Sequence, residues 1–231
     1  MKKYAIKLFL GLFVCSIIVT MVVQQNANAS IEKQVDNNIA AINEMIKKEV
    51  ALKSELASSS NPYDYIKDNT DFEKIITLGN DALPVLHNKL AKSTNNGLQE
   101  YIPAIAIERI AKVDMKKKES TQWETAKDFE KVWKNHLKAI PATVEAIVSN
   151  KILTSEEKVK QLVELGTLAI PFIMDKVESD DEKVFPAVIE LTKNNKSTVA
   201  PIDTAGAKDW VTKNKSSFNS LKQYVLNQQQ Q

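Results

Sequence analysis

Apolar residues recur three or four positions apart along most of the chain after residue 29, which is the spacing of amphipathic helices. Runs that alternate apolar and polar residues are too short to predict a strand. The pattern therefore predicts an all-α protein. The first stripe consists of Ile31, Val35, Ile39, Ile42, Ile46 and Val50.

This stripe predicts one helix over residues 30–58, ended by the turn residues that follow. We expect the helix to pack on the body of the protein or to hold it off a membrane as a stalk. A coiled-coil dimerisation helix is the alternative, although the stripe is shorter than the roughly three to four heptads that coiled coils usually show.

One segment of the sequence occurs twice. Leu-Gly-x-x-Ala-Leu-Pro at residues 78–84 returns, 87 residues later, as Leu-Gly-x-x-Ala-Ile-Pro at residues 165–171. In each copy the glycine is suited to end one helix, and the proline falls in the first turn of the next. Two such αα-hairpins in tandem predict a short α-solenoid, an architecture that presents surfaces.

The helix boundaries are also marked by sequence. Capping boxes, in which Ser or Thr precedes Glu by three positions, are predicted at Thr70–Glu73, Thr121–Glu124, Thr154–Glu157 and Ser179–Glu182. Short proline-led segments over residues 62–69 and 141–150 are expected to precede the two copies. Pro103 and Pro186 fall about one turn into a third helix of each copy, where we expect kinks.

The first 29 residues have the pattern of an export signal. Lys2, Lys3 and Lys7 precede an apolar run over residues 8–23, and Ala27-Asn28-Ala29 is a small-residue cleavage site. The sequence predicts cleavage before Ser30. An uncleaved membrane anchor is the alternative, but the run is shorter than the roughly 20 residues of a spanning helix.

Composition excludes several classes of function. The single cysteine lies inside the predicted signal, so the mature chain has no disulfide, thiolate metal site or cysteine nucleophile. Lys and Arg total 31 against 29 Asp and Glu, and Arg109 is the lone arginine, so a nucleic-acid interface is not expected. The glycines are scattered, which argues against phosphate-binding loops. The histidines, His87 and His136, lack metal-ligand spacing.

Several side chains have predicted environments. His87 occupies the place of Met174 in the second copy, which indicates partial burial, and Arg109 is expected to pair with a neighbouring carboxylate. Trp133 and Trp210 are predicted to lie in the core, whereas Trp123 is predicted to be exposed in a first helical turn.

The hairpin over residues 78–86 and the Ala-rich helix after it resemble bacterial HEAT-like, or armadillo-type, repeats. The stretch from Asn61-Pro62-Tyr63-Asp64-Tyr65-Ile66 to the Trp-bearing helix resembles exported proteins of Bacillus-type bacteria, many of them uncharacterised. The likeness covers most of residues 61–138 and, more weakly, 154–215. It implies a helical repeat fold and says almost nothing about activity. With so few hairpins, the extended concave surface of long HEAT arrays is not implied.

These observations predict the organisation of the chain. It consists of a signal peptide (1–29), an amphipathic helix and linker (30–60), HEAT-like module 1 (61–138), HEAT-like module 2 (139–227) and a polar tail (228–231).

Functional residues are expected where the two copies differ, because shared positions serve the shared fold. The differing candidates include Lys116–Lys118, and the aromatic residues among them form the predicted binding surface: Tyr63, Tyr65 and Trp123. In the alternative interpretation, Tyr63 and Tyr65 only cover the end of the stack.

The expected function is non-catalytic protein–protein binding, secreted or at the bacterial cell envelope, without metal or cofactor. A structural or wall-associated tether, an enzyme and a small-molecule carrier are the alternatives. Membrane contact is expected only through a retained signal, and the oligomeric state stays open. An apolar groove between modules would favour binding. An acidic cleft that holds a carboxyl of raised pKa would favour an enzyme.

Overall fold

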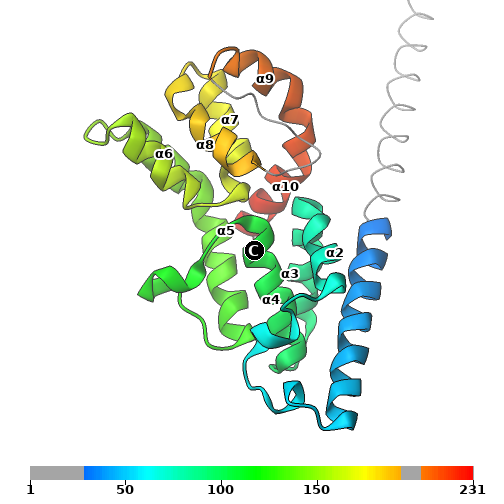
Figure 1. Ribbon diagram of the computed structural model, residues 1–231. Helices are drawn as coiled ribbons and strands as arrows, with labels where there is room; N and C mark the ends of the chain where they lie inside the picture. Colours follow the sequence, from blue (N-terminus) through cyan, green and yellow to red (C-terminus); the bar gives the residue numbers. More distant parts are fainter. Residues whose placement is uncertain (1–28, 194–203, 231) are drawn as a thin grey trace, which may run out of the picture.

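The computed structural model describes residues 29–193 and 204–230, and within these ranges every regular element is helical. The all-α prediction is therefore confirmed for this part of the chain. The predicted signal peptide lies outside the described residues, apart from Ala29. The helices form two halves, one above the other in Figure 1, joined by a long helix that runs through both.

The N-terminal helix covers residues 29–52 and packs on the first half (Figure 1). Val35 and Ile42 are fully buried, and Asp36 forms an ion pair with Lys89 of α3 (Leu83–Lys92). The apolar stripe thus meets the body of the same chain, as the packing interpretation expects. The helix ends before residue 58, and Val50 near its end is 56% exposed.

The first hairpin is formed by α2 (Thr70–Thr77) and α3, with a 3-10 turn between them, η3 (Gly79–Ala82). Gly79 has φ +63°, the left-handed conformation that glycine adopts without strain. The third helix, α4 (Leu98–Ala111), contains Pro103 and packs chiefly on α3.

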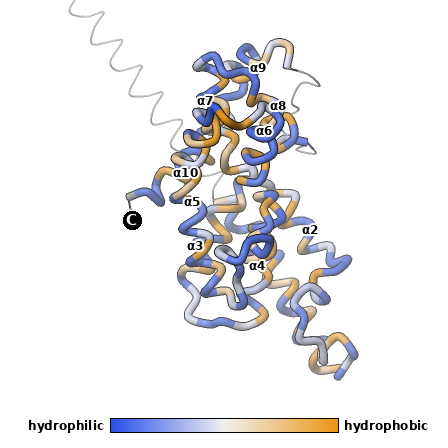
Figure 2. Tube along the Cα trace, turned by 90° about the vertical axis from the view of Figure 1, so that its left-hand side faces the viewer, coloured by the Kyte–Doolittle hydropathy of each residue, from blue (hydrophilic) through white to orange (hydrophobic). Residues whose placement is uncertain are grey.

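The second hairpin repeats this arrangement. It consists of α6 (Ser155–Val163), the 3-10 turn η6 (Thr167–Ala169) and α7 (Ile170–Glu178), followed by α8 (Phe185–Thr192). The strongly apolar α7 and α8 stand out in Figure 2. Thr167 Oγ1 donates to Asn80 Oδ1 at 2.7 Å, and these residues hold equivalent positions in the two copies. The turns of the two hairpins therefore lie side by side.

The two halves share α5 (Ala126–Ser149), which contacts α3 and α4 as well as α6 and α7. The predicted separate segment over residues 141–150 is wrong, because Pro141 lies inside this helix and the predicted boundary at residue 138 falls within it too. Apolar residues at helical spacing, Phe129, Trp133, Leu137, Ile140, Val144 and Ile147, continue across Pro141 and bury one face of α5 throughout.

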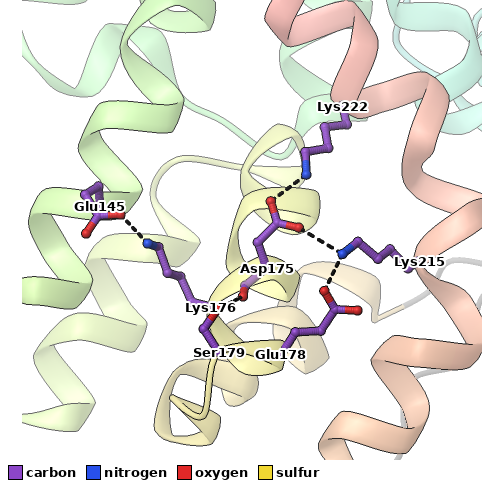
Figure 3. Close-up of polar contacts among 7 residues, drawn as sticks. All are labelled: Glu145, Asp175, Lys176, Glu178, Ser179, Lys215 and Lys222. Atoms are coloured by element: carbon purple, nitrogen blue, oxygen red, sulfur yellow. Dashed lines mark hydrogen bonds and ion pairs between the residues drawn. The ribbon is translucent and has the colours of Figure 1, made fainter.

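The chain ends with α9 (Ala207–Asn214), the 3-10 turn η8 (Lys215–Phe218) and α10 (Asn219–Asn227). The last helix contacts α5, α7, η3 and η6, so it lies between the halves. Figure 3 shows the charged contacts that join η8 and α10 to α7. Asp175 of α7 accepts from Lys222 at 2.5 Å and pairs with Lys215, which also pairs with Glu178.

Only some of the predicted helix starts are confirmed. Thr154 caps α6 in a capping box with Glu157. In contrast, α2 is capped by Asn69 rather than Thr70, and α5 by Thr125 rather than Thr121. In each case the residue that caps the helix is an Asn or Thr close to the predicted one and equally suited to the role. The capping-box motif alone therefore could not identify the cap.

The cap predicted at Ser179 is also wrong. Ser179 follows the end of α7, and Asp180 has φ +75°, which turns the chain. As a result α8 begins only at Phe185, and Pro186 lies in its first turn instead of one turn inside.

Candidate functional site

A groove of about 470 Å³ lies between the 3-10 turn η2 (Pro62–Tyr65), α2 and α4. We call it the Tyr63 groove. Its lining residues are Tyr63, Ile66, Lys67, Asp68, Glu73, Ile105, Glu108, Arg109, Val113 and Asp114.

The local sequence turns Tyr63 outward and Tyr65 inward. The Asn61 side chain accepts from the Tyr63 amide at 3.2 Å and caps η2. Tyr65 is 5% exposed, and its hydroxyl donates to the Ser59 carbonyl at 3.1 Å. Tyr63 is 43% exposed. Of these two predicted binding residues, only Tyr63 reaches the groove, and Tyr65 serves packing.

Glu108 of α4 is the most unusual residue of the groove, because only 8% of it is exposed. Its Oε1 accepts from the Met115 amide at 2.8 Å and from Trp123 Nε1 at 3.3 Å. Burial raises the pKa of the Glu108 carboxyl, and these two hydrogen bonds oppose the rise. Lys112, with φ +55°, lets the chain fold back after α4 so that Met115 can reach this carboxylate.

The exposure predicted for Trp123 is wrong: the side chain is 3% exposed. The loop before α5 folds over α4, and the indole ring packs against Tyr101 and Phe129, with ring centroids 5.4 and 5.1 Å away. Its N–H is satisfied by Glu108, which explains how a tryptophan in the loop before α5 can be buried here.

Lys116 links Tyr63 to Trp123. Its Nζ lies 4.2 Å from the centroid of the Trp123 ring and 5.8 Å from that of the Tyr63 ring. Tyr63 and Trp123, two of the three predicted binding residues, therefore both lie close to the Lys116 ammonium group. Trp123 itself exposes little surface to a partner. The neighbouring Lys117 and Lys118 point elsewhere and pair with Glu164.

Arg109 forms one wall of the groove. Its guanidinium binds Glu73 of α2 through two hydrogen bonds, of 2.7 and 3.3 Å, and lies over the Phe72 ring. The predicted pairing with a carboxylate is correct in kind, but the partner is 36 residues away in sequence. The pair joins α2 to α4 and fixes the width of the groove at this side.

Sequence reasoning missed Glu108. A signal was present, since this carboxylate interrupts the apolar run of residues 102–111, of which all except Arg109 are buried. A charged residue inside such a run indicates a paired or functional group.

A second polar cluster connects α3, α5 and α10. Trp133 Nε1 donates to the Tyr224 hydroxyl at 2.9 Å, and this hydroxyl lies 2.9 Å from His87 Nδ1. His87 is 6% exposed, more buried than its sequence indicated, and its Nε2 has no hydrogen-bond partner within the described part of the chain. Burial lowers the pKa of His87 to about 4. Trp133 is fully buried as predicted, while Trp210 is half-buried.

In residues 29–193 and 204–230, no group of three or more His, Cys, Asp or Glu side chains is arranged to hold a metal ion. Over the same ranges, no helix has the length and apolar character needed to cross a membrane.

Comparison with known proteins gave no match to any family model, curated protein or solved structure.

Proposed function

We propose that this chain is an exported, non-catalytic binding protein of the bacterial cell envelope, and that its Tyr63 groove receives a segment of another protein. The observation that carries the proposal is the groove itself, in which an exposed aromatic ring lies beside a buried carboxylate. Such a combination of apolar surface and a few fixed polar groups is typical of binding sites.

The rest of the proposal is supported by the sequence and by the repeat. Residues 1–29 have the pattern of an export signal, and the chain after them has no cysteine. The two hairpins, with Gly79 and Gly166 both at positive φ, support the HEAT-like interpretation of the modules. A scaffold of this kind would present the groove on rigid helices.

An enzyme is the second candidate, since the Tyr63 groove contains a carboxyl of raised pKa, Glu108, and three other carboxyls, Asp68, Glu73 and Asp114. Binding is favoured because both hydrogen bonds to Glu108 come from N–H donors. Donors of this kind stabilise the charged carboxylate and do not favour the protonated form that a general acid must supply.

Site-specific photo-cross-linking tests the proposal. A benzophenone-bearing amino acid replaces Tyr63, and in a matched control it replaces Ile152, which is 92% exposed outside the groove. In envelopes of the producing cells, the residue-63 variant should give a discrete cross-linked protein that the residue-152 variant does not. Equal cross-linking from both positions, or none from residue 63, would contradict the proposed binding surface.

A further inference from the structure

Glu108 keeps one carboxylate oxygen free of hydrogen bonds within the described part of the chain. Both of its hydrogen bonds end on Oε1, and among the described residues no hydrogen bond ends on Oε2. The residue is more than nine-tenths buried and still lines the groove. A carboxylate held in such a low-dielectric setting attracts a cation more strongly than a solvated one does.

The charges around Glu108 favour a positive ligand. The groove is lined by four carboxylates, Asp68, Glu73, Glu108 and Asp114, and by two cations, Lys67 and Arg109. Arg109 and Glu73 neutralise each other through their paired hydrogen bonds. Asp68, Glu108 and Asp114 then face Lys67 in the lining and Lys116 beside it, so the groove keeps an excess of negative charge.

The aromatic residues beside the groove already hold an ammonium group. Lys116 Nζ lies over the Trp123 ring and within 5.8 Å of the Tyr63 centroid, and its charge lowers the pKa of Glu108. Lys116 therefore shows, within the chain, the kind of group that these rings accept.

We propose that the Tyr63 groove binds a primary ammonium group, that of a lysine side chain on the partner, between Glu108 Oε2 and the Tyr63 ring. This inference rests on the proposed function and names the chemistry of its ligand. Lysine fits better than arginine, because two N–H donors already occupy Oε1 and one free oxygen cannot satisfy a bidentate guanidinium. The apolar stem of the lysine would pack on Ile66, Ile105 and Val113.

A titration with small probes tests the inference. The protein, purified as the expressing cells process it, is titrated with Nα-acetyl-lysine methylamide. The NMR resonance of the Trp123 indole N–H is followed, since this group donates to Glu108. The lysine probe should give a saturable shift. The norleucine analogue, which has a similar stem without charge, should give none, and the arginine analogue should bind about fivefold more weakly.

Variants separate the charge of Glu108 from its structural role. Glu108→Gln keeps an oxygen acceptor for Met115 and Trp123 but removes the charge, so affinity for the lysine probe should fall about tenfold. Tyr63→Leu, at an exposed position, should weaken binding about threefold. Glu124→Gln is the matched control, because it removes one exposed carboxylate next to Trp123 outside the groove, and it should bind as the unmodified protein does.

Equal affinity of the Glu108→Gln variant and the unmodified protein, or equal binding of the norleucine probe, would overturn the inference. Cross-linking from residue 63 without lysine-probe binding would also overturn it, while leaving the proposed function in place. Lysine-probe binding without cross-linking would support the ammonium site and contradict a protein as the partner.

Discussion

Acid should loosen the contact between α10 and the first half of the protein through His87. Tyr224 receives the Trp133 N–H on its oxygen, and its own hydroxyl proton is satisfied when it donates to His87 Nδ1. This arrangement requires a neutral imidazole. A protonated His87 would turn Nδ1 into a second donor toward Tyr224, and its Nε2 lies 3.9 Å from Glu130, too far for a hydrogen bond. Lys134, which lies on α5 together with Glu130, also opposes the protonation of His87.

The magnitude follows from the pKa of His87, which falls from 6.5 to about 4 on folding. A group whose pKa is lowered in the folded state contributes stability above its unfolded pKa and loses it as the pH falls. At 1.36 kcal/mol per pKa unit, about 3 kcal/mol should be lost between pH 7 and pH 4. The side chain is 8% exposed, so little of this is screened by solvent.

The perturbation is His87→Met, which installs the residue found at the equivalent place in α7, Met174. At pH 7 the variant should be less stable by about 1–2 kcal/mol, because the Tyr224 hydroxyl loses its acceptor. On going to pH 4 the difference between the two proteins should shift by about 3 kcal/mol in favour of the variant.

Urea unfolding followed by tryptophan fluorescence at several pH values measures both free energies. Other groups that titrate, His136 among them, are common to the two proteins and cancel in the difference. A difference in unfolding free energy that stays constant from pH 7 to pH 4 would refute the assigned proton arrangement.

Three further predictions concern the fold and the processing of the chain. Gly166→Ala should destabilise by more than about 2 kcal/mol, since a Cβ there meets the Ala111 carbonyl oxygen, whereas Gly79→Ala, with open space around it, should cost about 1 kcal/mol; equal unfolding free energies for the two variants would contradict the close approach. Leu83→Ala and Ile170→Ala should each lower the unfolding free energy by about 2–5 kcal/mol, because both side chains are buried in equivalent hairpins; neutral effects at both sites would contradict the repeat register. Intact-mass analysis of the released protein should show Ser30 as the first residue, and a retained Met1 would indicate an anchor.

The repeat and the helical class could be predicted from the sequence because they depend on local chemistry. Gly79 and Gly166 mark turns that need a positive φ, and Thr154 forms the predicted capping box with Glu157. Trp133 could be placed in the core because Phe129, on the same helix, and Trp210 hold matching places in the two copies, which indicates a shared packing role.

The groove could not be predicted, because it depends on how distant segments meet. Trp123 is buried only because the loop before α5 folds onto α4. Arg109 of α4 pairs with Glu73 of α2, a contact between two separate helices. Pro141 shows the same limit, since a residue that usually breaks helices is accommodated inside the continuous α5.

The most direct test of the account combines the cross-linker at residue 63 with Glu108→Gln in the same chain. The account predicts that the cross-linked partner seen with Glu108 intact is largely lost in the Glu108→Gln background and kept in the Glu124→Gln background. A cross-link of undiminished yield with Glu108→Gln would contradict the central claim, that this buried carboxylate is what the partner recognises.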